Sequence, residues 1–180
     1  MIVKFINKPI GILGGSFDPP HIGHLKIANY SLKKLNLKKI YWLVTKKNPL
    51  KKKPYFSLQK RIKLSKELVE DNKRINVVYF DNKVRSSKTI KLLKFLIKKE
   101  KSNNIYLIIG SDNIINFKKW HDWDQILKLS RIVVFSRRGF DQKALKIMST
   151  IRKKSKNIMF IKNQKIDISS SNIRDNIKKN

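Results

Sequence analysis

The chain has 180 residues, contains no cysteine, and carries a formal net charge of +31 at pH 7. A chain of this length suits a single domain spanning residues 1–180, and without cysteine it can form neither a disulfide framework nor a thiolate metal site. No apolar run approaches the roughly 18 residues of a membrane-spanning helix, and Met1–Gly15 lacks the apolar length and flanks of a signal peptide, so we expect a cytoplasmic protein.

Short apolar runs alternate along the chain with longer amphipathic ones. The short runs are rich in β-branched residues and apolar on both faces, as buried parallel strands are: Ile10–Leu13, Ile40–Val44, Ile75–Phe80, Ile105–Ile109, Ile132–Phe135 and Ile158–Ile161. Helical spacing predicts helices over His24–Leu35, Leu58–Val69, Thr89–Lys99, Asn113–Leu129 (broken near His121) and Gln142–Arg152. This alternation predicts an α/β fold with a doubly wound parallel sheet, whose strands meet at one edge with their carboxyl ends.

The first strand leads into residues 11–24, GILGGSFDPPHIGH. Gly14 and Gly15 allow a sharp turn and the close approach of a ligand to the main chain. The two prolines suit the entry to a helix, so His21 and His24 lie one turn apart on one face of its first turn. Free N–H groups, the helix dipole and two imidazoles favour a phosphate there and can stabilise charge in phosphoryl or nucleotidyl transfer. A zinc site would need a third ligand, which is not evident, so we assign no metal ligand.

A second candidate anion site lies near the C-terminus. In Ile166–Asp175, IDISSSNIRD, three serines precede a short helical pattern. Serine is a favoured N-cap residue, and Arg174 follows about one turn into the helix, where it can reach the same anion. Taken alone, the segment is most simply a capped terminal helix.

A third segment follows the fourth predicted strand. Gly110–Leu127, GSDNIINFKKWHDWDQIL, contains Trp120 and Trp123, three residues apart. This spacing is typical of two aromatic residues on a buried helix face. A tryptophan at the mouth of a pocket can also stack on a planar ring, and more strongly on a cationic ring such as pyridinium.

The first two of these segments resemble the nucleotidylyltransferase superfamily. Residues 14–24, GGSFDPPHIGH, are similar to its hallmark block, whose HxGH motif stands here as His21-Ile22-Gly23-His24. Residues 169–174, SSSNIR, resemble its SSTxIR motif, with Ser171 where threonine is usual. Because both residues carry a hydroxyl group, this departure is mild.

Three further blocks are similar to one branch of that superfamily, the nicotinate mononucleotide adenylyltransferases. Gly110–Leu127 resembles its GADN…W..W block, and Trp42–Lys53, WLVTKKNPLKKK, resembles its loop with Asn-Pro-x-Lys after the second strand. Val84–Leu93, VRSSKTIKLL, resembles its SYTxxTL block, with Lys88 in place of tyrosine and Leu92 in place of the second threonine. These resemblances cover almost the whole chain in the family's order.

The resemblance implies a Rossmann-like nucleotidylyltransferase fold and a reaction of NAD biosynthesis. ATP and nicotinate mononucleotide would give deamido-NAD and pyrophosphate, with Mg²⁺ carried on the ATP phosphates. The 5′-phosphate of the mononucleotide would attack the α-phosphorus of ATP in line, so catalysis would rest on positioning and charge stabilisation.

The resemblance also implies roles for individual residues. The catalytic residues would be His21, His24 and Arg174. These three would bind ATP together with Gly14, Gly15, Ser16, Phe17, Gly110, Asp112, Ser170 and Ser171. The mononucleotide would contact Lys51, Thr89, Asp112 and Trp120, with Thr89 at the nicotinate carboxylate and Trp120 stacked on the pyridine. Lys51 stands in the basic loop Thr45–Tyr55 among other lysines, any of which could contact the phosphate.

Three alternatives stay open. A nicotinamide mononucleotide enzyme would differ by one amide in place of a carboxylate, and a pantetheine-phosphate adenylyltransferase is disfavoured by the segment at Gly110–Leu127. A basic nucleic-acid-binding module would suit the net charge of +31, but the lysines are spread along the chain, as on a solvated surface. Such a module gives no reason for HxGH beside SSSNIR, so we expect no specific nucleic-acid or membrane partner. Whether the chain forms a homo-oligomer is not settled by the sequence.

Overall fold

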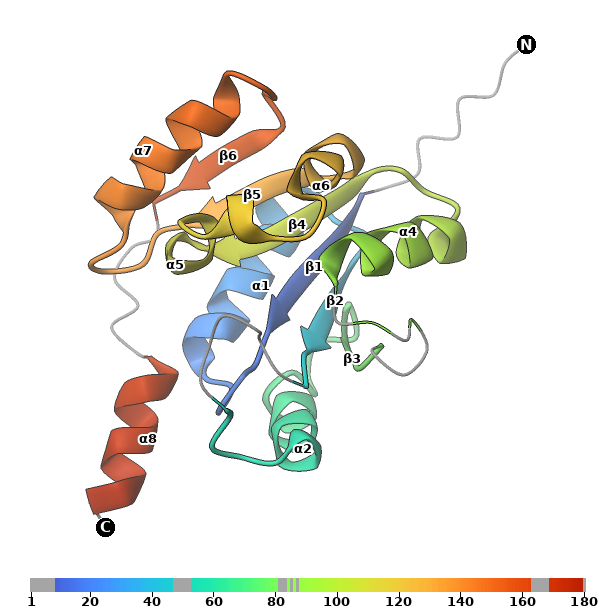
Figure 1. Ribbon diagram of the computed structural model, residues 1–180. Coiled ribbons are helices and arrows are strands. Elements are labelled where there is room, and N and C mark those ends of the chain that lie inside the picture. The colour runs from blue at the N-terminus through green and yellow to red at the C-terminus, as the bar shows by residue number, and fades with distance from the viewer. Residues whose placement is uncertain are drawn as a thin grey trace.

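The computed structural model describes residues 9–46, 53–80, 84, 86, 88–162 and 169–179, which form a six-stranded sheet covered by helices on both faces (Figure 1). The strands are β1 (Ile10–Gly15), β2 (Lys39–Val44), β3 (Ile75–Val78), β4 (Ile105–Gly110), β5 (Arg131–Phe135) and β6 (Ile158–Ile161). The helices are α1 (Ile22–Lys34), α2 (Leu58–Leu68), α4 (Thr89–Glu100), α5 (Ser111–Ile114), the 3₁₀ helix η1 (Phe117–Lys119), α6 (Trp123–Leu129), α7 (Asp141–Arg152) and α8 (Ser170–Lys179).

All strand pairs in the sheet are parallel, and the strand order is β3-β2-β1-β4-β5-β6. The chain therefore winds outward from β1 in one direction and from β4 in the other. Ligands of open parallel sheets bind beyond the carboxyl ends of the strands, at the point where the winding reverses. Here that point lies between β1 and β4, and the predicted doubly wound α/β fold is confirmed.

The two faces of the sheet are buried against different helices. Ile12 of β1 belongs to a core cluster with apolar residues of α4, α6 and α7. The next residue, Leu13, belongs to a second cluster with residues of α1 and α2. Side chains of each strand alternate between two faces that are both covered by helices, so the strands are apolar throughout. The predicted strands were identified from these uninterrupted apolar runs.

Some element boundaries differ from those predicted. β1 continues to Gly15, which pairs with Val44 of β2. β3 ends at Val78, although Phe80 is buried at 5% exposure. The expected helix over Asn113–Leu129 consists of α5, η1 and α6, and the break before α6 lies at the predicted place, where Asp122 has a left-handed φ of 52°.

The C-terminal helix stands outside this layered arrangement. In Figure 1, α8 extends away from the sheet, and its first turn lies near the start of α1. Like the other helices of the described ranges, α8 has neither the length nor the apolar character needed to cross a membrane. The position of α8 is defined by polar contacts of Ser170 and Arg174 with the turn after β1.

Packing around Gly11 generates a stability prediction. A Cβ atom there would lie 2.8 Å from Ile40 Cγ1 and 2.8 Å from Leu37 Cδ1, and both side chains are at most 1% exposed. We predict that Gly11→Ala lowers the free energy of unfolding by about 1–3 kcal/mol in urea titrations, because these buried side chains must shift. Gly14→Ala is the control, since its Cβ would meet only Leu43 Cδ2, at 3.9 Å. Equal losses in the two variants would contradict this packing.

Candidate active site

The turn after β1 is anchored by the ring of Phe17. This residue is 3% exposed and stacks on Trp42 of β2, with ring centroids 4.5 Å apart. Its backbone has a φ of 46°, in the left-handed region that non-glycine residues seldom adopt. The same ring packs in a T-shaped arrangement with the ring of His24, with ring centroids 5.0 Å apart. Phe17 therefore fixes both the turn and the position of His24 against the sheet.

The main chain of this turn is held by donors from β2 and α2. Gly14 and Gly15 end β1, and the carbonyl oxygen of Gly15 accepts hydrogen bonds from the backbone N–H and the hydroxyl group of Thr45, at 2.9 and 3.2 Å. The carbonyl oxygen of Ser16 accepts from the guanidinium of Arg61 at 2.6 Å. These bonds fix the path of the backbone into the first turn of α1.

The two histidines lie together at the start of α1, as predicted. His21 is the N-cap residue, and its ring centroid is 3.8 Å from that of His24. The backbone N–H of His21 donates a hydrogen bond to Nδ1 of His24 at 3.3 Å. Because Nδ1 accepts, the proton of the neutral His24 ring is assigned to Nε2, which is then a hydrogen-bond donor.

The ring of His21 is buried without hydrogen-bond partners. The residue is 7% exposed, and neither ring nitrogen has a partner among the described residues. Burial, together with the positive charge of Arg137, lowers the pKa of His21 from 6.5 to about 4. A buried and unpaired polar group is uncommon in folded proteins, so these nitrogens are suited to a ligand such as a phosphate group.

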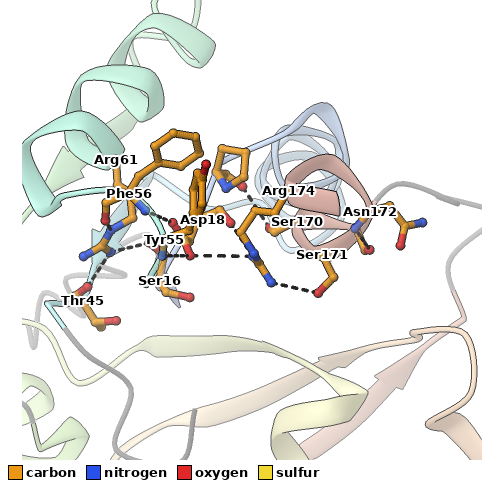
Figure 2. A network of polar contacts seen from close by, with 12 residues as sticks. Ser16, Asp18, Thr45, Tyr55, Phe56, Arg61, Ser170, Ser171, Asn172 and Arg174 are labelled. Carbon is orange, nitrogen blue, oxygen red and sulfur yellow. Dashed lines mark hydrogen bonds and ion pairs between the residues drawn. The ribbon is translucent and has the colours of Figure 1, made fainter. Parts of the chain in front are cut away.

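The start of α8 meets the start of α1 at two carbonyl groups (Figure 2). Ser170 Oγ donates to the carbonyl oxygen of Pro19 at 2.9 Å. Arg174 Nη1 donates to the carbonyl oxygen of Asp18 at 2.5 Å, and Nη2 donates to Ser171 Oγ at 3.1 Å. The two helix starts to which the resemblance assigns ATP binding therefore lie side by side, and Arg174 is bound to the loop that carries His21.

The first turn of α8 is capped by a serine, as the sequence pattern indicates. Ser169 Oγ accepts a hydrogen bond from the backbone N–H of Asn172 at 3.1 Å. Such a bond satisfies one of the free N–H groups at a helix start. The capped-helix interpretation and the anion-site interpretation are thus compatible, because Ser169 caps the helix while Ser170 binds the Pro19 carbonyl group and Ser171 accepts from Arg174.

A third cation, Arg137, stands at the same edge of the sheet. It follows β5, and its Nη1 lies 2.9 Å from Oδ2 of Asp112 at the start of α5. Its backbone N–H donates to Asp141 at 2.8 Å, and Asp141 also accepts from the hydroxyl group of Ser111 at 2.8 Å. Asp141 therefore ties the ends of β4 and β5 together, and the charge of the nearby Arg137 guanidinium acts on His21.

The structure gives Gly110 a local role. A Cβ atom at this position would lie 2.5 Å from Oδ1 of Asp112. In the structure it is therefore the Asp112 carboxylate that approaches the main chain closely at Gly110. The predicted approach of adenosine at Gly110 stays a prediction.

Of the residues predicted for the mononucleotide, Thr89 and Trp120 lie on two neighbouring segments. Thr89 begins α4, and Nζ of Lys88 is 3.4 Å from Nε2 of His121, the residue after Trp120. The start of α4 and the Trp120 segment are therefore adjacent. Trp120 is partly buried against Phe117, with ring centroids 5.3 Å apart.

Of the two tryptophans, neither is fully buried. Trp123 also packs on Phe117, with ring centroids 6.1 Å apart, and Nζ of Lys154 lies 5.2 Å from the centre of its ring. The expectation of a buried helix face therefore holds in part for both tryptophans. Lys51, the fourth residue predicted for the mononucleotide, lies outside the described residues.

Asp18, Arg61 and Arg137 are polar residues of the site that the sequence analysis missed. Arg61 is 1% exposed and Asp18 is 6% exposed. In a chain with 43 lysines and arginines, no local pattern distinguishes a buried arginine from a surface one. The signals were the position of Asp18 inside the GGSFDPPHIGH segment and that of Arg137 directly after a strand.

These features define the class of the protein. A parallel α/β sheet carries, beyond its central strands, two imidazoles at a helix start and a guanidinium from a second helix start. Such an arrangement suits the transfer of a nucleotidyl group from a nucleoside triphosphate, which is the class of reaction that the site supports.

Comparison with solved structures supports this fold. The Plasmodium falciparum nicotinic acid mononucleotide adenylyltransferase complexed with APC has a TM-score of 0.74 and 21% sequence identity, over 94% of this chain and 83% of that chain. The same protein complexed with NaAD has the same values. At this level of identity the likeness concerns the fold.

Sequence comparison identifies the family. The profile described as "Cytidylyltransferase-like" matches residues 12–176. A "probable nicotinate-nucleotide adenylyltransferase" of Pelagibacter ubique is 44% identical over 92% of this chain and 91% of its own length. A relative of the same name from Aquifex aeolicus is 33% identical over 89% of this chain and 98% of its own length. The chain belongs to the cytidylyltransferase-like family and, within it, to the nicotinate-nucleotide adenylyltransferases.

The lowered pKa of His21 predicts acid sensitivity. Between 6.5 and about 4 the unfolded chain binds a proton at this residue and the folded chain does not, so stability is lost as the pH falls through this window. We predict that the free energy of unfolding falls less between about pH 7 and about pH 4.5 in His21→Gln than in the wild type. His121→Gln, which removes a side chain that is 52% exposed, is the control. Equal pH dependence in His21→Gln and the wild type would contradict the burial of a neutral His21.

Proposed function

We propose that this enzyme transfers the adenylyl group of ATP to nicotinate mononucleotide, giving deamido-NAD and pyrophosphate, in NAD biosynthesis. One observation carries the proposal: the His21–His24 pair lies beside the loop that Arg174 contacts, at the end of β1. The names of the curated relatives support the choice of acceptor, and a structural neighbour is described as complexed with NaAD. We expect the reaction to take place in the cytoplasm.

The start of α1 receives the triphosphate of ATP in this proposal. Free N–H groups and the helix dipole attract an anion there, and the backbone of residues 14–17 lines its approach. Ser170, Ser171 and Arg174 bind the β- and γ-phosphates from the side of α8. No group of three or more metal-ligating side chains occurs within the described ranges, so we assign Mg²⁺ to the phosphate oxygens of ATP, on which it enters as part of the substrate.

Chemistry occurs at the α-phosphorus. An oxygen of the 5′-phosphate of the mononucleotide attacks in line; the new P–O bond forms as the bond to the bridging β-phosphate oxygen breaks, and the electron pair leaves with pyrophosphate. A phosphate monoester is already anionic at neutral pH, so no strong general base is needed. His21, neutral because its pKa is about 4, and His24 donate N–H groups to the oxygens on which charge develops. Their role is positioning and charge stabilisation.

The mononucleotide occupies the space between α4 and the Trp120 segment. In this proposal Thr89 binds the nicotinate carboxylate through its backbone N–H and hydroxyl group, and Trp120 stacks on the pyridine ring. Asp112 lies between the two substrates, and Lys51 contacts the mononucleotide phosphate. The adjacency of Lys88 and His121 supports a shared pocket formed by these segments.

The substrate assignment predicts a clear order of acceptors. Pyrophosphate release from ATP and Mg²⁺ is measured with nicotinate mononucleotide, nicotinamide mononucleotide and phosphopantetheine in parallel, with a reaction in excess EDTA as baseline. We predict the highest kcat/KM for nicotinate mononucleotide. A preference for either of the other acceptors would contradict the assignment while leaving the nucleotidyltransferase class intact.

The two imidazoles generate a second prediction. His21→Ala and His24→Ala are each expected to lower kcat on the order of 10²-fold, because each removes a hydrogen-bond donor to the transition state. Single-turnover measurements of adenylyl transfer check this result. Lys63→Ala is the control, since this side chain is 79% exposed on α2 and pairs with Glu67, outside the assigned site. Near-wild-type turnover in both active-site variants rejects the role assigned to the pair.

A further inference from the structure

Asp18 is a buried carboxylate to which the mechanism above gives no role. It is 6% exposed, and its two oxygens accept the backbone N–H groups of Tyr55 at 2.7 Å and Phe56 at 2.8 Å (Figure 2). Burial lowers the pKa of the Arg61 guanidinium, and the negative charge of Asp18 opposes that shift. Such partners are what a buried charge requires.

Arg61 joins the surrounding main chain into one unit. Its guanidinium donates to carbonyl oxygens in three segments: Ser16 at 2.6 Å, Thr45 at 2.8 Å, Lys46 at 3.0 Å and Phe56 at 3.1 Å. The turn after β1, the end of β2 and the segment before α2 therefore share one buried cation. Because Asp18 is bound to the same segment before α2, its position is defined before any ligand binds.

Arg174 is oriented by this fixed group. Its Nη1 donates to the carbonyl oxygen of Asp18 at 2.5 Å and lies 3.7 Å from the carboxylate oxygen Oδ2. Its Nη2 donates to Ser171 at 3.1 Å. Two nitrogens held by two different partners define the plane of the guanidinium, although the side chain is 27% exposed. An arginine without such partners would lose rotamer freedom when it bound a phosphate.

We propose that Asp18 is a positioning residue for ATP: it holds Arg174 at the start of α1, so that the guanidinium meets the triphosphate already oriented. The proposal deepens the proposed function, on which it rests for the identity of the nucleotide. Asp18 contacts no substrate itself. Its effect reaches ATP through Arg174, and it depends on the platform that Arg61 builds around it.

The direction in which Asp18→Asn changes ATP affinity distinguishes a positioning role from the effect of a nearby negative charge. A carboxylate close to a triphosphate repels it, so Asp18 acting only as a nearby negative charge would weaken ATP binding. Its replacement by asparagine would then tighten binding. If Asp18 orients Arg174, the same replacement weakens binding, because the guanidinium loses its anionic partner.

The test is the dissociation constant for ATP with Mg²⁺, measured by isothermal titration calorimetry on the full chain. For Asp18→Asn we expect the Kd to rise roughly tenfold, with circular dichroism confirming the fold and kcat changing less than KM for ATP. An unchanged or lower Kd would overturn the proposal. Glu100→Gln is the matched control, because it removes a carboxylate that pairs with Lys39, at the start of β2, without touching the site.

A double-mutant cycle tests whether Asp18 acts through Arg174. Adding Asp18→Asn to Arg174→Ala should leave the Kd for ATP at the value of Arg174→Ala alone, because the positioned group is already gone. Additive effects would contradict action through the guanidinium. ATP binding is measured without the acceptor, so a wrong acceptor leaves this test unaffected, whereas a wild-type chain that binds no ATP overturns both proposals.

If Asp18→Asn does not fold, ATP binding by Arg174→Lys tests the same proposal. Lysine retains the charge but has a single nitrogen, so it cannot reach the Asp18 carbonyl oxygen and Ser171 in the same way. We expect ATP binding to weaken in this variant nearly as much as in Arg174→Ala. Wild-type affinity in Arg174→Lys would overturn the proposal, because a point charge without orientation would then suffice.

Discussion

The contact between the starts of α1 and α8 is the interaction on which the rest of the site depends. Arg174 and Ser170 bind the carbonyl oxygens of Asp18 and Pro19, which are 156 and 151 residues away in the chain. A single helix start offers an anion only its N–H groups and its dipole. A triphosphate carries several charges over a longer span, so a second set of donors is needed. The doubly wound sheet supplies the geometry by bringing its strand ends to one edge.

Three arginines lie at this edge of the sheet, and each has hydrogen-bond partners within the protein that compensate the burial of its charge. Arg61 is bound to four carbonyl groups, Arg137 to Asp112, and Arg174 to the Asp18 carbonyl group. His21 avoids a charge altogether, since burial and Arg137 lower its pKa to about 4. Assembling positive charge in a partly buried crevice is costly unless it is compensated. In the proposed mechanism, the same compensation holds the donors to the phosphates in place before ATP binds.

Parts of this arrangement could be predicted from the sequence, and the reasons are physical. The strands are buried on both faces, so their apolar runs stand out, as in Ile105–Ile109 and the observed β4. His21 and His24 are close in sequence, so their juxtaposition follows from helical spacing alone. Arg61 could not be recognised, because its burial depends on carbonyl groups from three segments and its neighbours are also basic. Asp18 was overlooked for a similar reason: its partners Tyr55 and Phe56 come from another loop.

The central claim is that both helix starts bind one triphosphate. It is tested most directly by a crystal structure of the protein with a non-hydrolysable ATP analogue. We predict that His21 and His24 lie within hydrogen-bond distance of the phosphate oxygens, and that the Arg174 guanidinium binds the β- and γ-phosphates of the same molecule. An analogue bound at α1 with Arg174 turned away, or bound elsewhere on the chain, would contradict it.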